Sequence, residues 1–420
     1  MQKTPTFIDL FAGCGGLSLG LLNAGWKGSF AVERTSDAFL TYQKNLIDSG
    51  KFQYEWPTWL PKSEIDIEEL LNKYEGHLAK LKGCIDLIAG GPPCQGFSPA
   101  GKRNPNDPRN RMAEKYIAVV RLIKPKFLVL ENVRGFNVPF QGVGKGKRSI
   151  PYSEVVKRRL EKEGYKVEFR VLVSAEWGVP QIRPRFILIA TRRDLELEWK
   201  PFDDLVSNRV SFLDSRGLAT NRHQTTMDAI DDLRVEGREL IASTDGSVSG
   251  FKQIRYSVPQ KVSAFISLMR KGMAGTEGPN SLRLPQHRPH VVERFLSILN
   301  ECPKGKTISK EQRDKFGLKK HSMTPLCPEK PSATMTTLPD DFLHYSEPRI
   351  LTVREMARIQ SFPDWFEFLG SYTTGGSLRK VSCPRYTQVG NAVPPLLGEA
   401  LGELIMRAVK YSDNPQEKAA

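Results

Sequence analysis

A cysteine set by two prolines is the residue of this chain best suited to covalent chemistry. The segment Gly90-Gly91-Pro92-Pro93-Cys94-Gln95-Gly96-Phe97-Ser98 follows a short apolar run, residues 85–89, that predicts a buried strand. Prolines restrict the backbone, so the thiol is held just past a strand end, where open α/β sheets carry their sites. Because a thiolate is the most nucleophilic side chain near neutral pH, this position predicts nucleophilic catalysis. An incidental cysteine in a rigid loop is the alternative.

A glycine-rich turn and an acid predict a site for a nucleotide-type cofactor. Phe11-Ala12-Gly13-Cys14-Gly15-Gly16 follows the first predicted strand, and glycines let a ligand approach the backbone closely. Glu33 ends the second predicted strand, 20 residues after Gly13, where a carboxylate can accept hydrogen bonds from ribose hydroxyls. The third glycine comes early for a dinucleotide fingerprint, which disfavours a pyrophosphate-binding site. A tight turn without a ligand is the alternative.

Two other segments place polar groups at strand ends. Glu131 ends a predicted strand, and burial there favours its neutral form, which could donate a proton or hydrogen bond. Gln181, Arg183 and Arg185 alternate along an extended segment, so we expect the three donors to share one face and suit an anionic or carbonyl-rich ligand. A helix-capping acid and a solvated basic strand are the alternatives. Residues 388–395 predict only a turn.

The elements that position these residues follow an alternating pattern. Strand and helix signals alternate over residues 1–195, which predicts an α/β fold with a doubly wound, mostly parallel sheet. Residues 200–330 are irregular and predict a second domain. The predicted strands are residues 7–11, 29–33, 85–89, 127–131, 167–173 and 186–191. The predicted helices are residues 17–22, 65–81, 112–123, 260–269, 291–299, 353–359 and 396–409.

The composition is that of a basic protein with an ordinary core. The chain has 420 residues, 26% charged and 39% apolar, and no apolar run approaches the ~20 residues of a membrane span. Six cysteines without a C-x-x-C pair argue against a disulfide framework and a zinc site. The first residues lack a signal-peptide pattern, so we expect a cytoplasmic protein. The formal net charge of +15 favours a polyanionic partner.

Taken together, these segments resemble the DNA (cytosine-5)-methyltransferase family. They occur in the family's order, with a long variable stretch after the Gln-Arg-Arg segment. The resemblance is closest to the bacterial restriction–modification enzymes, because nothing extends beyond the catalytic unit. The segments that carry it are residues 11–16, Glu33, 92–95, 107–110, 131–133, Gln181-x-Arg183-x-Arg185, 354–363 and 390–395.

The resemblance implies a class I S-adenosylmethionine-dependent methyltransferase fold with a smaller, irregular DNA-recognition domain inserted in it. Residues 1–195 and 385–412 would form a discontinuous catalytic and cofactor-binding domain. Residues 196–384 would form the target-recognition domain and hinge, and residues 413–420 a tail.

The resemblance also implies a reaction and the residues that carry it. The Cys94 thiolate would add to C6 of a flipped-out cytosine, whose C5 then takes the methyl group of S-adenosylmethionine. Glu131 would hold N3 and the exocyclic amine, Arg185 would hold O2, and Arg183 would support Glu131 or the same site. The implied cofactor contacts are Phe11, Gly13, Gly15, Gly16, Glu33, Asp66, Pro93 and Asn391, with Asp86 as an alternative to Asp66. No metal is expected.

The implied partner is double-stranded DNA, bound by a monomer, with a cognate restriction endonuclease acting separately. The expected DNA contacts are Gln95, Ser98, Lys102 and Arg103 in the loop after the cysteine, and Arg255 and Arg288, beside Gln286 and His287, in the variable segment. The family often has a bulky apolar residue after the ribose-binding acid, whereas this chain has Arg34.

Three other functions remain open from the sequence. A tRNA cytosine-5 methyltransferase of the same fold is disfavoured by the long segment 200–330. A catalytically silent DNA-binding relative is disfavoured because Cys94, Glu131 and Arg185 are all present. A nicotinamide oxidoreductase is disfavoured by the glycine pattern and by the Pro-Pro-Cys turn.

Overall fold

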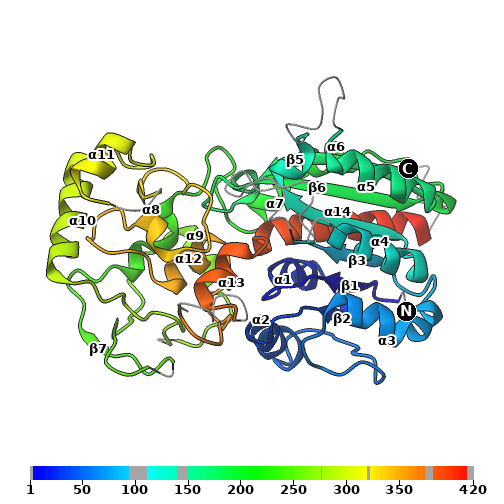
Figure 1. The fold of residues 1–420 in the computed structure, drawn as a ribbon, viewed down its shortest axis with the longest axis horizontal. Coiled ribbons are helices and arrows are strands. Elements are labelled where there is room, and N and C mark those ends of the chain that lie inside the picture. The colour runs from blue at the N-terminus through cyan, green and yellow to red at the C-terminus, as the bar shows by residue number, and fades with distance from the viewer. Residues whose placement is uncertain are drawn as a thin grey trace. The chain divides into compact units, whose positions relative to one another are not determined.

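The chain folds into two compact units (Figure 1). The computed structural model describes residues 3–93, 111–139, 150–246, 248–275, 277–318, 322–373 and 382–413. The sheet unit comprises Met1–Val173, Pro184–Arg209 and Leu397–Ala420, and the inserted unit comprises Ser174–Arg183 and Val210–Leu396. The functional domains expected from the sequence have somewhat different bounds and remain a prediction.

The sheet unit is built on a six-stranded, mostly parallel sheet, in the order β2-β1-β3-β4-β6-β5. Neighbours among the first four strands of that order run parallel, whereas β6 runs antiparallel to both β4 and β5. The doubly wound fold expected from the sequence is confirmed. The strands are β1 (Thr6–Leu10), β2 (Lys27–Val32), β3 (Leu87–Gly90), β4 (Phe127–Val133), β5 (Tyr165–Val173) and β6 (Pro184–Arg192).

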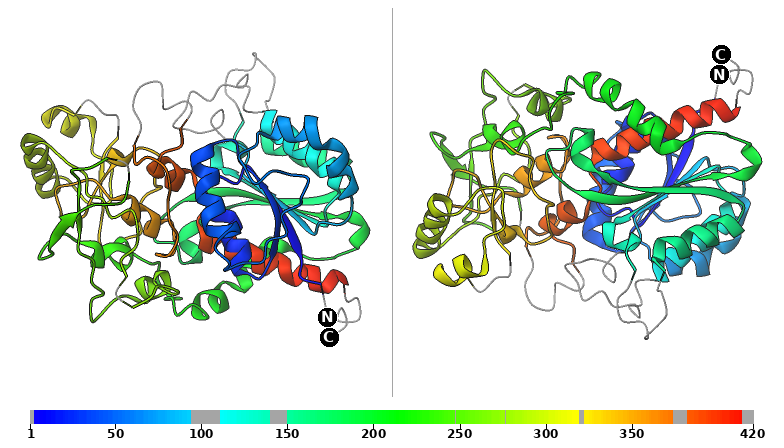
Figure 2. Two further views of the ribbon diagram at one scale, coloured as in Figure 1. Left: turned by 90° about the horizontal axis from the view of Figure 1, so that it is seen from below. Right: turned by 90° about the horizontal axis from the view of Figure 1, so that it is seen from above.

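Helices cover both faces of this sheet. Helices α3, α4 and α5 lie together on one face, and α1 and α14 lie on the other (Figure 2). Every residue of β1 and β3 is buried, as expected for strands covered on both sides. The helices are α1 (Gly16–Asn23), α2 (Ser36–Tyr42), which continues into a π-helical turn (Gln43–Ile47), α3 (Ile67–Lys80), α4 (Met112–Ile123), α5 (Tyr152–Lys162), α6 (Pro201–Ser207) and α14 (Pro395–Asp413).

The inserted unit has only short strands, so side chains rather than a large sheet organise it. Its helices are α7 (Arg209–Asp214), α8 (Thr226–Ile230), α9 (Ala264–Met269), α10 (Pro289–Glu301), α11 (Lys310–Lys315), α12 (Val353–Ile359) and α13 (Arg385–Asn391). Its strands pair as β7 (Leu240–Ala242) with β8 (Lys252–Ile254) and β9 (Thr324–Pro325) with β10 (Phe342–Leu343). The sheet unit has two short 3-10 turns among its described residues, Arg134–Asn137 and Arg193–Leu195. The described part of the inserted unit has three, which are Ser174–Trp177, Asp231–Leu233 and Pro339–Asp341.

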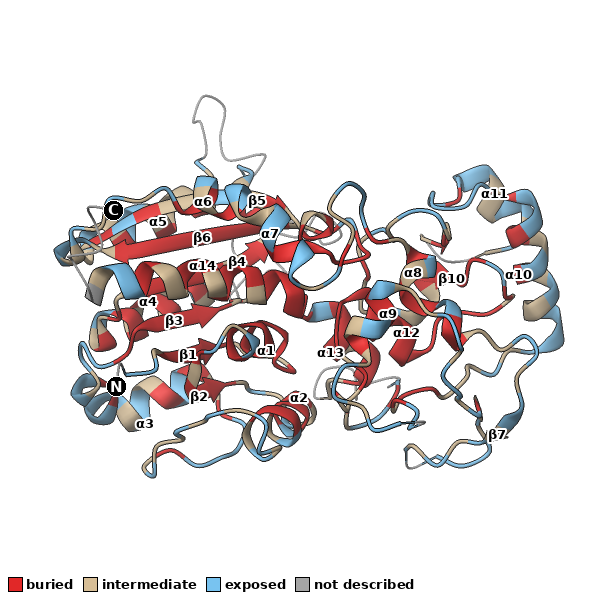
Figure 3. Cartoon of the chain, turned by 180° about the vertical axis from the view of Figure 1, so that it is seen from behind, coloured by how far each residue is buried: buried red, intermediate tan, exposed pale blue. Residues whose placement is uncertain are grey.

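Helix α12 is buried along its whole length although it carries three charged residues (Figure 3). Arg358 donates to both Asp232 and Asp364 over distances of 2.6–3.0 Å. Burying a charge is costly unless it is paired and hydrogen-bonded, so these carboxylates are what permits the arginine inside.

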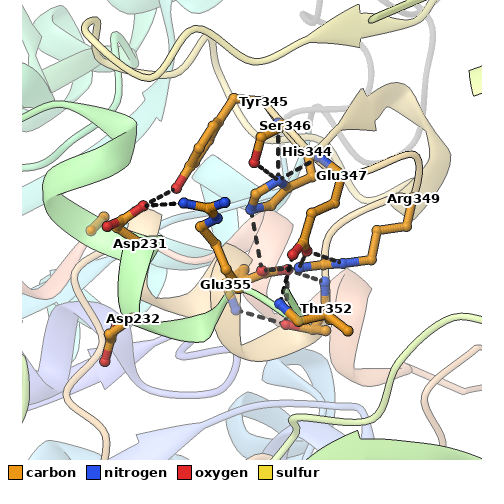
Figure 4. A network of polar contacts seen from close by, with 12 residues as sticks. Asp231, Asp232, His344, Tyr345, Ser346, Glu347, Arg349, Thr352 and Glu355 are labelled. Atoms are coloured by element: carbon orange, nitrogen blue, oxygen red, sulfur yellow. Dashed lines mark hydrogen bonds and ion pairs between the residues drawn. The ribbon is translucent and has the colours of Figure 1, made fainter. Parts of the chain in front are cut away.

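A second polar network surrounds Glu355 of the same helix (Figure 4). Arg349 makes a two-pronged contact with the Glu355 carboxylate at 2.7 and 2.8 Å, and it also pairs with Glu347. Nδ1 of His344 accepts hydrogen bonds from the backbone N–H groups of Ser346 and Glu347. Burial lowers the pKa of His344 well below its ordinary value, which keeps the acceptor nitrogen unprotonated.

Candidate active site

The carboxyl end of β3 leads directly into the turn that precedes Cys94. Gly91 follows the strand, and a β-carbon on it would lie 3.1 Å from Oε2 of Glu131, two residues before the end of the neighbouring strand β4. The buried Asn132 side chain donates to the carbonyl oxygen of Pro92 at 3.1 Å, which fixes the start of the turn. A glycine therefore lets the Glu131 carboxylate lie against this turn. Cys94 itself lies outside the described residues.

Glu131 forms an ion pair with Arg185. Nε of Arg185 lies 2.7 Å from Oε1 of Glu131, and the two side chains are only 9% and 13% exposed respectively. The antiparallel register of β4 and β6 sets this contact, since Val133 lies opposite Arg185. The sequence-based expectation for this acid did not include the neighbouring cation. The pair gives a fixed acceptor beside a fixed fork of N–H donors.

Arg183 contacts backbone segments of the inserted unit. Its guanidinium donates to the carbonyl oxygens of Met335, Gly390 and Ala392 at 2.8–3.3 Å, all within the inserted unit. Gln181 accepts from the backbone N–H of Met335 and donates to Gln360. The two side chains therefore tie backbone segments of that unit together. Arg185 is the arginine seen to pair with Glu131, and the supporting role expected of Arg183 remains a prediction.

The glycine-rich turn and Glu33 lie together as expected from the sequence. Oε2 of Glu33 accepts from the backbone N–H of Gly13 at 3.0 Å, and Oε1 accepts from the backbone and hydroxyl of Thr35 at 2.8 and 2.6 Å. Since a carboxylate has about four acceptor positions, one remains for a ribose hydroxyl. Gly15 has φ +97°, and a β-carbon there would lie 2.6 Å from Leu46, so the tight turn requires glycine. This preformed turn with its oriented acid fits a nucleoside-bearing cofactor.

The two candidates for an acid near the adenine occupy different ends of the sheet. Asp66 caps helix α3 by accepting from the N–H of Glu68 at 2.8 Å, and the preceding Ile65 donates its N–H to the carbonyl of Glu33. Asp86 instead accepts from Thr6 at the beginning of β1 and pairs with Lys126. Asp86 therefore lies at the amino ends of the strands, away from the glycine turn, and the alternative is wrong. Asp66 remains the candidate.

Sequence reasoning missed a buried polar chain beneath the glycine turn. Asp9 in β1 accepts from the Ser18 hydroxyl at 2.6 Å, Ser18 contacts the Tyr42 hydroxyl at 2.8 Å, and Tyr42 contacts that of Tyr54 at 2.5 Å. Burial, opposed by the Ser18 hydrogen bond, raises the pKa of Asp9 to about 7. An aspartate inside the apolar run Phe7-Ile8-Asp9-Leu10 was the available signal, because buried acids need partners.

The residues expected to contact DNA are only partly described. Gln95, Ser98, Lys102 and Arg103 lie outside the described residues. Arg255 is exposed and forms a two-pronged ion pair with Glu239, and Arg288 is the residue that precedes helix α10. Gln286 donates to the carbonyl of Gly250, and His287 accepts from the N–H of Ile350.

The expected turn at residues 388–395 is wrong in its first half. Residues 385–391 form helix α13, which ends at the exposed Asn391. The helix signal was weak because the segment contains a glycine and β-branched residues. The cofactor contact expected of Asn391 remains a prediction.

None of the described helices is both long and apolar enough to cross a membrane. Within the same part of the chain, no cluster of three or more His, Cys, Asp or Glu residues is arranged to hold a metal ion.

The fold and this arrangement of strand-end acids define a class I methyltransferase architecture. It is similar to a prophage-encoded E. coli protein assigned as a DNA modification methyltransferase, with a TM-score of 0.65 and 23% identity over 97% of this chain and 100% of that one. It is also similar to the Dnmt2 methyltransferase of S. pombe, with a TM-score of 0.51 and 16% identity over 97% of this chain and 99% of that one. At these identities the likeness concerns the fold.

The chain belongs to the C-5 cytosine-specific DNA methylase family, whose model matches residues 5–407. It is 31% identical to the type II methyltransferase M.DdeI of Desulfomicrobium norvegicum, covering 95% of this chain and 88% of that protein. It is also 31% identical to M1.HphI of Haemophilus parahaemolyticus, covering 96% and 87% respectively. The chain is thus a DNA (cytosine-5)-methyltransferase, as the motifs predicted.

Proposed function

We propose that the chain methylates C5 of a flipped-out cytosine within a specific duplex DNA sequence, through a covalent bond between Cys94 and C6. One observation carries the proposal. The Glu131 carboxylate, held by Arg185 at 2.7 Å, lies against Gly91 at the start of the Gly-Pro-Pro-Cys turn. A positioned acid and the segment that bears the thiol thus share the carboxyl ends of neighbouring strands.

The reaction begins with the Cys94 thiolate, which forms a bond to C6 and moves an electron pair toward C5. Glu131 contacts the N3 and exocyclic amine edge of the cytosine and balances the charge that develops there. Arg185 holds Glu131 in place and offers a remaining N–H to the O2 oxygen. After C5 has gained its methyl group, loss of the C5 proton and of the thiolate restores the aromatic ring.

The cofactor site fits S-adenosylmethionine, which supplies an electrophilic methyl group when bound. Phe11, Gly13, Gly15 and Gly16 form the turn that would approach it, and Glu33 would accept hydrogen bonds from its ribose. Asp66, Pro93 and Asn391 are proposed to complete the contacts.

A cytosine stacked in a duplex is inaccessible to these groups, so it must be flipped out of the helix. The sequence of residues 98–104 is polar and basic, which suits contacts to phosphates. By analogy with the type II relatives, we place the enzyme in a bacterial restriction–modification system. It would act as a monomer in the cytoplasm and protect host DNA from a separate endonuclease.

Bisulfite sequencing of DNA from cells that express the chain tests the proposal. We expect cytosine-5 methylation confined to one sequence context, and none with Cys94→Ser, because a serine hydroxyl is a much weaker nucleophile at neutral pH. Duplexes with 5-fluorocytosine at that site should form a denaturation-resistant complex, since fluorine cannot leave as a proton does. Methylation by the serine variant at the wild-type rate, or absence of the complex, would contradict the mechanism.

The assignment of residues 196–384 to recognition has its own test. Exchanging residues 200–330 for those of a related enzyme should transfer the recognised sequence while cytosine-5 methylation persists. An active hybrid that keeps the original target would place recognition elsewhere in the chain.

A further inference from the structure

The inserted unit contains an arginine whose charged group is stacked on rings but not paired. The Cζ atom of Arg283 lies 3.6 Å from the ring centre of Tyr372 and 4.0 Å from that of Phe251. Its side chain makes no hydrogen bond or ion pair with any residue that the structure describes. It is half-buried, so its planar N–H donors are partly accessible to a ligand.

The backbone around Arg283 is fixed on both sides. Asp245 accepts from the backbone N–H of Ser281 at 2.6 Å, from the Tyr372 hydroxyl at 2.9 Å and from Arg385 at 2.7 Å. On the other side, the N–H of Leu284 donates to the carbonyl of Lys252 at 2.8 Å. One carboxylate therefore holds both the chain before Arg283 and one of the rings on which it stacks.

Ser281 also has an unusual backbone conformation. Its φ is +65°, in the left-handed region that a serine adopts only at a cost. Such strain persists where the surrounding structure over-determines it, and it is frequent at ligand sites. The hydrogen bonds to Asp245 supply that determination here. The position of Arg283 is thus prepared before any ligand binds.

Several other arginines of the inserted unit use their donors internally. Arg255 is paired with Glu239, and Arg358 with two aspartates. Arg216 is a close comparison, because its Cζ lies 3.6 Å from the ring centre of Phe212, yet it donates to the Phe212 carbonyl and the Ser215 hydroxyl. Stacking alone therefore does not distinguish Arg283. Arg283 combines stacking with N–H donors that no described residue uses.

When aromatic rings cover the faces of an arginine's planar guanidinium group, its N–H donors point outward from the edge of that plane. That edge matches two acceptor atoms side by side, as on guanine O6 and N7 or on two phosphate oxygens. Aromatic contacts keep the fork in one plane while leaving its edge free. Resting on the proposed function, we propose that Arg283 binds such a pair of acceptors on the target DNA, and that the Phe251–Tyr372–Asp245 platform orients it.

The experiment compares Arg283→Lys and Arg283→Ala with Arg216→Lys, a matched change at a stacked arginine whose donors are used. Thermal melting first establishes that each variant is folded. Fluorescence anisotropy then measures binding to the wild-type target duplex and to duplexes with each base pair changed in turn, at several salt concentrations. Methylation of the same duplexes is measured in parallel.

If Arg283 reads a guanine, both substitutions should weaken binding to the target by roughly 10- to 100-fold. Discrimination should then be lost at one G·C pair and kept at the others. If it binds phosphate, Arg283→Ala should weaken binding to all duplexes equally and reduce the slope of log K against log salt by about 0.9, with lysine partly replacing arginine. Arg216→Lys should change neither the affinity for DNA, nor the base discrimination, nor the salt slope.

Unchanged affinity, base discrimination and salt slope in both Arg283 variants would overturn the inference. An equal effect of Arg216→Lys would also overturn it, because the loss would then be general. Failure of the proposed function is separate, since it would appear as absence of methylation by the wild-type protein while anisotropy still reports binding.

Discussion

Replacing Arg185 with methionine should reveal how far the Glu131 carboxylate depends on its partner. Methionine keeps an unbranched side chain but removes the charge that lies 2.7 Å from Glu131. At an effective dielectric constant of about 20, the attraction across that distance is ~6 kcal/mol, and desolvation of both groups opposes it. Removing one partner of a buried pair costs about 3–5 kcal/mol. Since Glu131 keeps 13% exposure, we expect about 3 kcal/mol.

A double-mutant cycle separates this structural effect from the chemistry. Glu131→Gln combined with Arg185→Met leaves no unpaired charge. The double variant should therefore lose about 1–2 kcal/mol less free energy of unfolding than the two single variants lose together. All three variants should lose at least ~10²-fold in rate, the usual scale for a positioned acid. Urea unfolding followed by circular dichroism measures stability, and single-turnover methyl transfer measures the rate.

Two results would refute this reasoning. Strictly additive stability losses would mean that the two side chains are not coupled in solution. A wild-type rate in Arg185→Met would mean that Glu131 needs no partner to act, whatever the stability shows.

Three other changes have expected outcomes. Glu33→Ala should weaken S-adenosylmethionine binding in calorimetry without changing DNA affinity, and equal cofactor affinity would exclude Glu33 as a ribose ligand. Gly91→Ala should slow methyl transfer, because the added methyl would lie 3.1 Å from Glu131, and an unchanged rate would show that the carboxylate can move. Burial raises the pKa of Asp9 from 3.8 to about 7, so the folded state binds a proton that the unfolded chain releases. Stability from this group is therefore lost as pH rises from about 4 to 7, by up to ~4 kcal/mol, and Asp9→Asn should flatten that slope in urea unfolding at pH 5 and 8.

The strands were predictable because burial on both faces gives them continuous apolar sequences. All six predicted runs overlap observed strands. Glu33 directly follows β2 as the pattern predicts, whereas β4 continues to Val133, two residues beyond Glu131. The direction of β6 was not predicted. The connection between β5 and β6, Ser174–Arg183, is shorter than the dozen or more residues that a parallel crossover needs. This short connection was the sequence signal that could have indicated an antiparallel pair.

The contacts of the site depend on register and on distant partners, which a local pattern does not encode. Gln181, Arg183 and Arg185 would share a face only in one continuous strand, but β6 begins at Pro184. Arg358 meets Asp232 across 126 residues, and nothing near either residue in the sequence indicates the other. Long-range pairs of this kind decide which charges are structural.

That distinction changes what the net charge of +15 means. Read from the sequence, every arginine of the inserted unit adds to a field that attracts DNA. In the structure, Arg349, Arg354, Arg358 and Arg385 are buried, and carboxylates neutralise three of them directly. Their role is to hold a unit that lacks a large sheet. Affinity for DNA must therefore depend on fewer cations than the count suggests, and Arg283 stands apart because aromatic rings, rather than carboxylates, hold its charge in place.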